Sequence, residues 1–269
     1  MNNTELQLLA NYIYEFCGID YRKNLPSLES KIEGRIKELK LSLWEYTGYV
    51  KVDDKEKDLL IELITVNETY FFREDNLLTE IEKVIYPQYK DRTSINPLRI
   101  WCAACSSGEE PYTLAMLVKE TNLFKEGAVE IIASDINKKV LNKAKKALYH
   151  KKSLSFRKMP AGMTQKYFDD DGDNYKIKDE VRSIVKFKHI NMFDKNVVNE
   201  IGKVDIIICR NVLIYFDTDA IKKLVGTFYQ LIKHNGYLLL GHAETITNIN
   251  PGFETIYTPS IFYYKKEED

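Results

Sequence analysis

The chain has 269 residues with 39 Lys and Arg against 40 Asp and Glu, so its formal net charge is −1. With 44% hydrophobic and 29% charged residues, it has the composition of a globular protein with a hydrophobic core. The near-neutral charge argues against a general nucleic-acid binder, which usually carries a basic excess. The apolar runs are far shorter than the roughly 20 residues that span a bilayer, and the N-terminus, MNNTELQLL, shows no secretory signal. We therefore expect a cytoplasmic protein without membrane insertion.

The first quarter of the chain predicts a small all-helical domain over residues 1–75. Apolar residues recur there at three- and four-residue steps in four segments, at 4–17, 28–39, 42–50 and 55–66. A further helix over 74–86 is expected to end near Pro87. The polar stretch QYKDRTSINP that follows is typical of a connection.

After Pro97, strand-like runs alternate with helical segments, which predicts an α/β fold with a mostly parallel sheet covered on both faces. The strands are expected at 98–104, 129–136, 185–192, 204–212 and 237–244. Helices are expected between them at 109–120, 137–148 and 217–233. A last strand at 260–266 has no helix after it and is expected to add in antiparallel orientation.

Residues 76–269 are thus predicted to form a second domain. One stretch interrupts its alternation of strands and helices, because two short strand-like pieces flank the turn Asp171-Gly172-Asp173-Asn174. We expect a small β insertion there, at about 160–185.

The chain has four cysteines, at Cys17, Cys102, Cys105 and Cys209. The second and third form a CxxC pair, which is a redox or zinc motif only with further ligands nearby. The four histidines show no ligand spacing. We therefore expect no metal site and predict small, buried, reduced thiols, as is usual in a cytosolic protein.

Candidate ligand-binding residues stand at the carboxyl ends of the predicted strands, where α/β sheets bind ligands. The segment CAACSSGEEPYTLAM (102–116) follows the first strand, and its small residues and Gly108 lead into a helix N-terminus that favours an anionic group. An ordinary turn capped by Ser107 explains the same residues equally well. Asp135 ends the second strand, where an acidic residue commonly accepts hydrogen bonds from ribose hydroxyls. Its alternative role is the N-cap of the next helix.

Two further strand ends carry polar side chains. Asn191 and Asp194 follow the third strand, and an amide there could read an adenine edge, although turn chemistry alone explains both residues. Arg210 and Asn211 directly follow the apolar run Ile206–Cys209 of the fourth strand. Arg210 could instead form a structural ion pair, and Asn211 could be an ordinary turn residue. Two polar groups together at a strand end nevertheless favour a ligand site.

The segment TVNETYFFRE (65–74) precedes the sheet. Local chemistry explains it by a helix cap at Asn67 or Thr69, by packing of the two phenylalanines at the domain interface, and by a surface position for Arg73. Taken alone, this segment favours no ligand.

Together these segments resemble the chemotaxis receptor methyltransferase family of the CheR type. The resemblance spans roughly residues 65–245 and rests on five motifs in the family's order, NETYFFRE (67–74), WCAACSSGEEPYTLAM (101–116), ASDIN (133–137), NMFD (191–194) and CRNVLIYF (209–216). It implies a protein-glutamate O-methyltransferase that uses S-adenosylmethionine, with a helical domain followed by a Rossmann-like sheet. The implied substrate is glutamate side chains on the cytoplasmic helical bundle of chemoreceptors. We expect a monomer that does not bind nucleic acid.

The resemblance also implies roles for individual residues. Asp135 would hold the ribose, and Asn191 with Met192 would meet the adenine. Arg73 and Tyr215 match the positions discussed for catalysis. The family's cofactor contacts fall on Asn67, Thr69, Arg73, Glu110, Asp135, Asn191, Met192, Asn211 and Val212.

Three features bear on receptor docking and on departures from the family pattern. The helix at 28–41 would be the one that faces the receptor, with Lys31 and Arg35 on one face. The turn DDDGDN is shorter than the corresponding loop of members that tether to a receptor's C-terminal pentapeptide. Cys102 and Cys105 stand where small Ser or Ala residues are commoner.

Three other activities on a similar sheet fit the residues less well. Methyltransferases that modify amino groups often carry an Asn/Asp-Pro-Pro-aromatic segment after the fourth strand, where this chain has RNVLIYF. A non-catalytic module that only binds S-adenosylmethionine is disfavoured because all motif positions are intact. A dehydrogenase would require the GxGxxG loop that the chain lacks.

Overall fold

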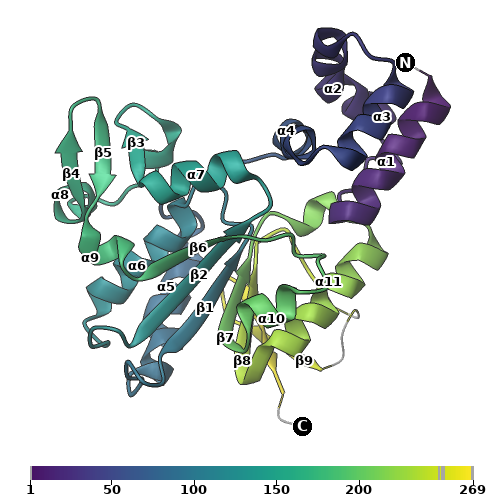
Figure 1. Cartoon of the computed structure of the whole chain (residues 1–269). Helices are drawn as coiled ribbons and strands as arrows, with labels where there is room; N and C mark the ends of the chain where they lie inside the picture. The colour runs from purple at the N-terminus through teal and green to yellow at the C-terminus, as the bar shows by residue number, and fades with distance from the viewer. Residues whose placement is uncertain (1, 248, 250–251, 268–269) are drawn as a thin grey trace.

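The computed structural model of the chain describes residues 2–247, 249 and 252–267, and its first part is helical. Four helices form this part, α1 (Asn3–Cys17), α2 (Leu25–Leu39), α3 (Leu43–Val52) and α4 (Asp54–Ile64). Their apolar stripes share one buried cluster, which includes Leu9 and Ile32. Figure 1 shows this helical unit above one end of the sheet. In the described part of the chain, no helix combines the length and the apolar character needed to cross a membrane.

Polar residues at the helix starts explain where these helices begin. Ser42 and Glu45 form a reciprocal capping box at the start of α3. Asp53 caps α4 by accepting the backbone N–H of Glu56 at 2.8 Å. Such caps stabilise a helix by about 1 kcal/mol each.

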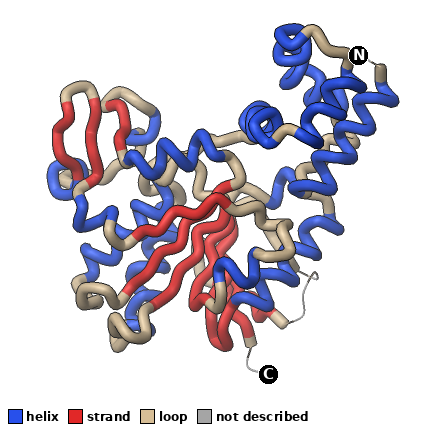
Figure 2. The backbone as a smooth tube through the Cα atoms, viewed as in Figure 1, coloured by secondary structure: helices blue, strands red, loops and turns tan. Residues whose placement is uncertain are grey.

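The second part is built on a sheet of seven strands, β1 (Leu98–Ala103), β2 (Val129–Asp135), β6 (Val185–His189), β7 (Val204–Cys209), β8 (Ile232–Leu240), β9 (Phe253–Tyr257) and β10 (Phe262–Lys266). Their order is β6-β2-β1-β7-β8-β10-β9. The first five in this order are parallel, and β10 pairs with β8 in the predicted antiparallel orientation. The order reverses beside β1, which is where α/β sheets bind ligands. The strands form the central layer in Figure 2.

Helices cover both faces of this sheet, as the sequence predicts. One buried cluster contains residues of α5 (Asp75–Glu80), α6 (Glu109–Thr121), α7 (Lys138–Lys146) and α9 (Asp179–Arg182). The other contains residues of α10 (Val197–Ile201) and α11 (Thr218–Leu231). Successive side chains of a strand point to opposite faces of the sheet, so β1 contributes to both clusters. Ile100 and Cys102 belong to the first cluster, and Trp101 and Ala103 belong to the second.

A second, three-stranded sheet interrupts the alternation. It has the order β3-β5-β4 and consists of β3 (Leu148–His150), β5 (Asn174–Ile177) and β4 (Phe168–Asp171), with α8 (Met163–Tyr167) before β4. The predicted hairpin is confirmed, since β4 and β5 pair antiparallel around the expected turn. Strand β3 was not predicted, because its first residue was assigned to the helix at 137–148. The left-handed backbone of Ala147 (φ 54°) ends that helix after Lys146.

The remaining differences lie at element ends. The predicted helix 74–86 divides into α5, a π-helical turn at Ile81–Ile85 and a 3₁₀ turn at Tyr86–Tyr89 that contains Pro87. Strand β8 already begins at Ile232, and β9 was not predicted. Strands β6 and β7 are shorter than expected, so Asn191 and Asn211 lie in the loops that follow them.

Two of the basic residues of α2, Lys31 and Arg35, bond to α4. Arg35 donates from Nε and Nη2 to the two carboxylate oxygens of Glu56 in α4 at 3.0 and 2.6 Å, and Glu56 is 1% exposed. Lys31 donates from Nζ to the backbone oxygen of Leu63 at 3.3 Å. These bonds give both residues a structural role, Arg35 at the start of α4 and Lys31 near its end. That the two residues face a receptor stays a prediction.

This pairing gives a stability prediction. Replacing Arg35 with alanine leaves the buried Glu56 carboxylate without its cation, so the Arg35→Ala variant should lose about 2 to 3 kcal/mol of unfolding free energy. Urea unfolding followed by circular dichroism measures this, with Lys37→Ala on the exposed side of the same helix as the control. Unchanged stability together with weaker receptor binding would instead support Arg35 as a docking residue.

Candidate active site

A pocket opens at the carboxyl edge of the sheet and faces the helical first part of the chain. The pocket and its open mouth together contain about 1020 Å³ of space that no protein atom fills. Loops after β1, β2, β6 and β7, the segment 64–69 and the end of α1 line it. All ten residues named by the resemblance lie in its wall, Asn67, Thr69, Arg73, Glu110, Asp135, Asn191, Met192, Asn211, Val212 and Tyr215.

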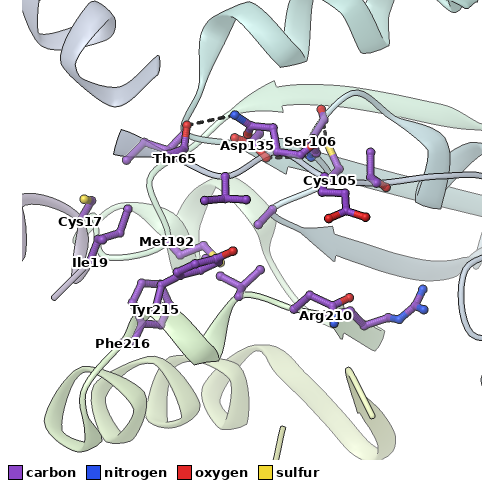
Figure 3. Close-up of a pocket in the computed structure, with 18 of the residues that line it drawn as sticks. Cys17, Ile19, Thr65, Cys105, Ser106, Asp135, Met192, Arg210, Tyr215 and Phe216 are labelled. Carbon is purple, nitrogen blue, oxygen red and sulfur yellow. Dashed lines mark hydrogen bonds between the residues drawn. The ribbon is translucent and has the colours of Figure 1, made fainter. Parts of the chain in front are cut away.

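Asp135 lies at the end of β2 with its carboxylate held by backbone donors. The N–H groups of Ser106 and Asn137 donate to its two oxygens, each at 2.8 Å. The alternative that Asp135 caps the next helix is wrong, because Asn137 is the N-cap of α7. Burial raises the pKa of the Asp135 carboxyl, while the backbone donors oppose that rise. Each oxygen keeps a lone pair for a hydroxyl ligand, and Figure 3 shows the side chain beside Ser106 at the pocket.

The loop after β1 follows a tight, partly left-handed path. Ala104 and Ser106 have φ values of 63° and 49°, and Gly108 has φ 94°. A Cβ on Gly108 would lie 2.9 Å from the Cβ of Ala144, so only glycine allows this close approach to α7. The alternative that Ser107 caps the helix is wrong, because Gly108 occupies the N-cap position of α6. This loop therefore places backbone rather than large side chains against the pocket.

The segment 65–74 contributes Arg73 to the pocket instead of forming a helix cap. Neither Asn67 nor Thr69 caps a helix, since Glu74 is the N-cap residue of α5. Two left-handed residues, Phe72 (φ 56°) and Glu74 (φ 64°), flank Arg73 and turn the chain sharply. Arg73 donates from Nη1 to the backbone oxygen of Glu68 at 3.1 Å and lines the pocket, so its alternative as a simple surface charge is wrong. Both phenylalanines of the segment are buried, as expected.

The side chain of Asn191 serves the local turn and the end of α1. Its Oδ1 accepts the N–H of Phe193 at 3.0 Å, and its Nδ2 donates to the backbone oxygen of Phe16 at 2.6 Å. The turn alternative is thus confirmed for this side chain, which also ties α1 to the sheet. Met192 beside it lines the pocket (Figure 3).

Arg210 forms the buried ion pair that was the alternative to a ligand role. Its guanidinium lies 2.9 Å from a carboxylate oxygen of Glu110 and 3.2 Å from one of Glu74. It also donates from Nη2 to the backbone oxygen of Arg73 at 2.6 Å. Burial raises the pKa of Glu110, and the adjacent guanidinium opposes that rise. Arg210 therefore fixes the backbone from which the Arg73 side chain extends.

Sequence reasoning missed Glu244, which organises the loop after β7. Its carboxylate is 3% exposed and accepts four backbone N–H groups at 2.7 to 2.8 Å, from Asn211, Val212, Leu213 and Gly241. Asn211 is held with φ 58°. The prediction of a strand over 237–244 concealed this residue, because β8 ends at Leu240 and Glu244 lies in the following loop. An acidic residue shortly after a strand end was the available signal.

Tyr215 closes the pocket on the side of the helical unit. It ends a 3₁₀ turn at Leu213–Tyr215, and its backbone oxygen accepts the N–H of Asp20 at 3.0 Å. The next residue, Phe216, forms an antiparallel bridge with Ile19 after α1. Burial raises the pKa of the Tyr215 phenol, so the hydroxyl stays protonated at neutral pH and can donate a hydrogen bond.

The cysteines are buried free thiols, as predicted. Burial raises the pKa of Cys102 and Cys105 well above the ordinary value, which keeps both as unreactive thiols. Among the described residues, no group of three His, Cys, Asp or Glu side chains is placed to hold a metal ion.

Fold and pocket together define a class of protein. A sheet of five parallel strands completed by an antiparallel pair carries a pocket at its switch point, with an acidic residue at the end of β2. This is a Rossmann-like methyltransferase that binds S-adenosylmethionine. The family model described as "CheR methyltransferase, SAM binding domain" matches residues 67–262, and the chain belongs to the CheR methyltransferase family.

Named relatives agree with this assignment. Chemotaxis protein methyltransferase 2 of Vibrio cholerae is 31% identical over 98% of this chain and 94% of its own length. Chemotaxis protein methyltransferase of Borreliella burgdorferi is 34% identical over 90% of this chain and 88% of its own length. Among solved structures, magnesium protoporphyrin IX methyltransferase of Synechocystis with bound SAM superposes with a TM-score of 0.44 at 16% identity, covering 81% of this chain and 85% of that one.

The arrangement around Glu244 predicts an indirect effect on cofactor binding. In the Glu244→Gln variant an NH₂ group replaces one carboxylate oxygen and faces backbone donors, so at least one charge-assisted hydrogen bond is lost. The loop after β7, which lines the pocket, is then held less firmly. We expect the dissociation constant for S-adenosylmethionine to rise at least about tenfold. Titration calorimetry measures the affinity, and Glu254→Gln on exposed β9 serves as the control. An unchanged affinity in a folded Glu244→Gln protein would refute this role.

Proposed function

We propose that this protein transfers a methyl group from S-adenosylmethionine to glutamate side chains on the cytoplasmic helical bundle of chemoreceptors. This proposal rests mainly on the observation that Arg73, Asp135 and Tyr215 line one pocket at the point where the strand order of the sheet reverses. The family membership and the names of the relatives support the same reaction. The product would be a glutamate methyl ester.

The donor set of the pocket fits this cofactor. Asp135 offers carboxylate oxygens to ribose hydroxyls, and Met192 and Ile136 offer apolar contact to a flat base. The lining residues Glu68, Glu110 and Asp135 outnumber the lining arginines Arg73 and Arg210, which suits a ligand with a cationic centre. When bound, S-adenosylmethionine supplies an electrophilic methyl group on a sulfonium.

The protein needs no general base for this reaction. A glutamate side chain has a pKa of about 4.3, so the substrate carboxylate is already the nucleophile at neutral pH. The residues of the pocket would act by aligning the reacting groups and excluding water from them, and well-oriented reactants gain about 7 to 11 kcal/mol. This agrees with the absence of His from the pocket lining among the described residues, and with the unreactive state of Cys17 and Cys105, whose pKa values are raised by burial.

Arg73 and Tyr215 would place the incoming carboxylate. The planar guanidinium of Arg73 matches the two carboxylate oxygens, and its backbone is fixed by Arg210. The Tyr215 hydroxyl can donate a further hydrogen bond. Tight ion pairing would stabilise the ground state as much as the transition state, so orientation is the role we assign to Arg73.

The proposed cellular setting follows from the substrate. We place the enzyme in the cytoplasm as a monomer, with residues 1–75 as the helical domain and 76–269 as the methyltransferase domain. Each transfer would remove one negative charge from a receptor helix, which changes the repulsion between helices and can shift a two-state signalling equilibrium.

The reaction class is tested with methyl-labelled S-adenosylmethionine and a cytoplasmic receptor fragment. We expect label on the fragment that mild base releases as volatile methanol, the signature of a carboxyl methyl ester. Base-stable label would indicate N- or C-methylation and exclude the glutamate reaction. Cofactor binding without any label on the fragment would favour a non-catalytic module.

Arg73 is tested by substitution. Losing the guanidinium misplaces the carboxylate, so Arg73→Ala should lower the methylation rate about 100-fold, and Arg73→Lys should restore only part of it. Initial rates at saturating S-adenosylmethionine measure the effect, with Arg182→Ala at an exposed pair with Asp179 as the control. Normal cofactor binding with full turnover in Arg73→Ala would show that Arg73 does not orient the substrate.

A further inference from the structure

The charge of this chain is distributed very unevenly. Residues 138–158 contain nine Lys and Arg and no Asp or Glu. The rest of the chain therefore carries 30 basic and 40 acidic residues, a net charge of −10 against +9 for this segment. The segment comprises α7, β3 and the loop at 151–158. Figure 1 shows α7 running along the top of the sheet between α4 and the three-stranded sheet.

Most of these cations face solvent. Three of the nine pair with carboxylates of neighbouring elements, Lys138 with Asp58, Lys139 with Glu62 and Lys151 with Asp170. We call the other six, which are all exposed, the basic surface; they are Lys143, Lys145, Lys146, Lys152, Arg157 and Lys158. Among the described residues, only Arg157 of this set has a carboxylate partner, Glu68 at 2.6 Å. The Tyr149 ring connects the two parts of the segment, since Lys143 lies 5.6 Å from its centroid and Phe156 packs against its edge.

Both ends of the segment adjoin the pocket. At its start, Ile136 lines the pocket and Asn137 donates to Thr65, another lining residue, at 2.8 Å. At its end, Arg157 pairs with Glu68, which also lines the pocket.

A stack of side chains joins the basic surface to the residue assigned to the substrate. The Arg157 guanidinium lies 3.8 Å from the centroid of the Tyr70 ring, and that of Arg73 lies 5.6 Å from the same centroid. A line of positive charge thus leads from the 151–158 loop to Arg73 in the pocket wall.

The pocket itself does not attract an anion. Its lining has three carboxylates and two guanidinium groups. The formal charge of this lining therefore does not draw a carboxylate substrate from a distance, and Arg73 would act on it only at short range, so long-range attraction would come from charge around the mouth.

We propose that the basic surface binds an acidic face of a helical protein, and that this face carries the glutamate to be methylated together with neighbouring carboxylates. The inference rests on the proposed function and adds the surface through which the substrate is selected. The charge of the surface is complementary to a glutamate-bearing helix, and its position beside the pocket lets one helix contact both. Because methylation neutralises a carboxylate, the surface holds the unmethylated helix more tightly than the product.

The test reverses three charges that have no carboxylate partner. The variant Lys145→Glu/Lys146→Glu/Lys152→Glu keeps the Arg157–Glu68 pair and every residue of the pocket. Its matched control, Lys90→Glu/Lys125→Glu/Lys222→Glu, makes the same change in net charge at exposed lysines outside the segment. KM for the receptor fragment, kcat and the affinity for S-adenosylmethionine are measured for both variants and the wild type.

We expect KM for the fragment to rise about tenfold in the test variant, the lower end of electrostatic steering effects, with kcat and cofactor affinity unchanged. The wild-type KM should also rise with salt more steeply than that of the variant. The control should behave as the wild type. Equal KM values for the test and control variants would overturn the inference.

Two further outcomes separate this inference from its alternatives. Failure of the wild type to methylate the fragment would refute the proposed function itself, whatever the variants do. The alternative partner is a lipid membrane, tested by co-sedimentation with phosphatidylglycerol vesicles. If the wild type and the control bind the vesicles and the test variant does not, while the KM of the test variant for the soluble fragment stays normal, the surface binds lipid and the protein-binding proposal is overturned.

Discussion

The buried guanidinium of Arg210 holds together the three segments that form the pocket. It extends from the end of β7, pairs with Glu110 at the start of α6 and with Glu74 at the start of α5, and donates to the backbone of Arg73. A buried cation is costly unless its donors are satisfied, and here they are satisfied by groups from separate parts of the chain. The position of Arg73 therefore depends on the hydrogen bond from the Arg210 side chain to the backbone oxygen of Arg73.

Backbone N–H groups complete this arrangement by holding carboxylates at two strand ends. Asp135 fixes the loop after β1 through Ser106, and Glu244 fixes the loop after β7 through three donors and accepts a fourth from Gly241 after β8. Both loops contain non-glycine residues with left-handed backbone, Ser106 and Asn211, which cost free energy unless the surroundings impose them. The buried carboxylates hold these two residues in place through their backbone N–H groups, so they stabilise the left-handed conformations at this edge of the sheet.

Local patterns in the sequence predicted most of the strands of the large sheet, the first four helices and the edge of the sheet at which the pocket lies. Periodicity placed α1 to α4, and strand ends marked Asp135 and Asn211, because carboxyl ends of parallel strands meet at one edge. The resemblance added Arg73 and Tyr215, which local chemistry assigned to no ligand. Glu244 and the Arg35–Glu56 pair were not predictable, since each depends on partners brought together only by the tertiary fold. Strand β3 was not predicted for a local reason. The helix before it ends at Ala147 in a left-handed conformation, and no glycine or asparagine in the sequence indicates that end.

Averaging over long segments also hid the charge pattern. Residues 1–75 have a net charge of −5 and the remainder +4, which describes a chain without a strong electrostatic preference. The acid-rich remainder of the methyltransferase part offsets the nine cations of residues 138–158 in that sum. A reaction between a cationic methyl donor and an anionic acceptor places opposite demands on one site, because a pocket that suits the first repels the second. Carboxylates in the pocket lining suit the cationic donor, and lysines on the adjoining helix and loop suit the anionic acceptor, so the two demands are met at different places.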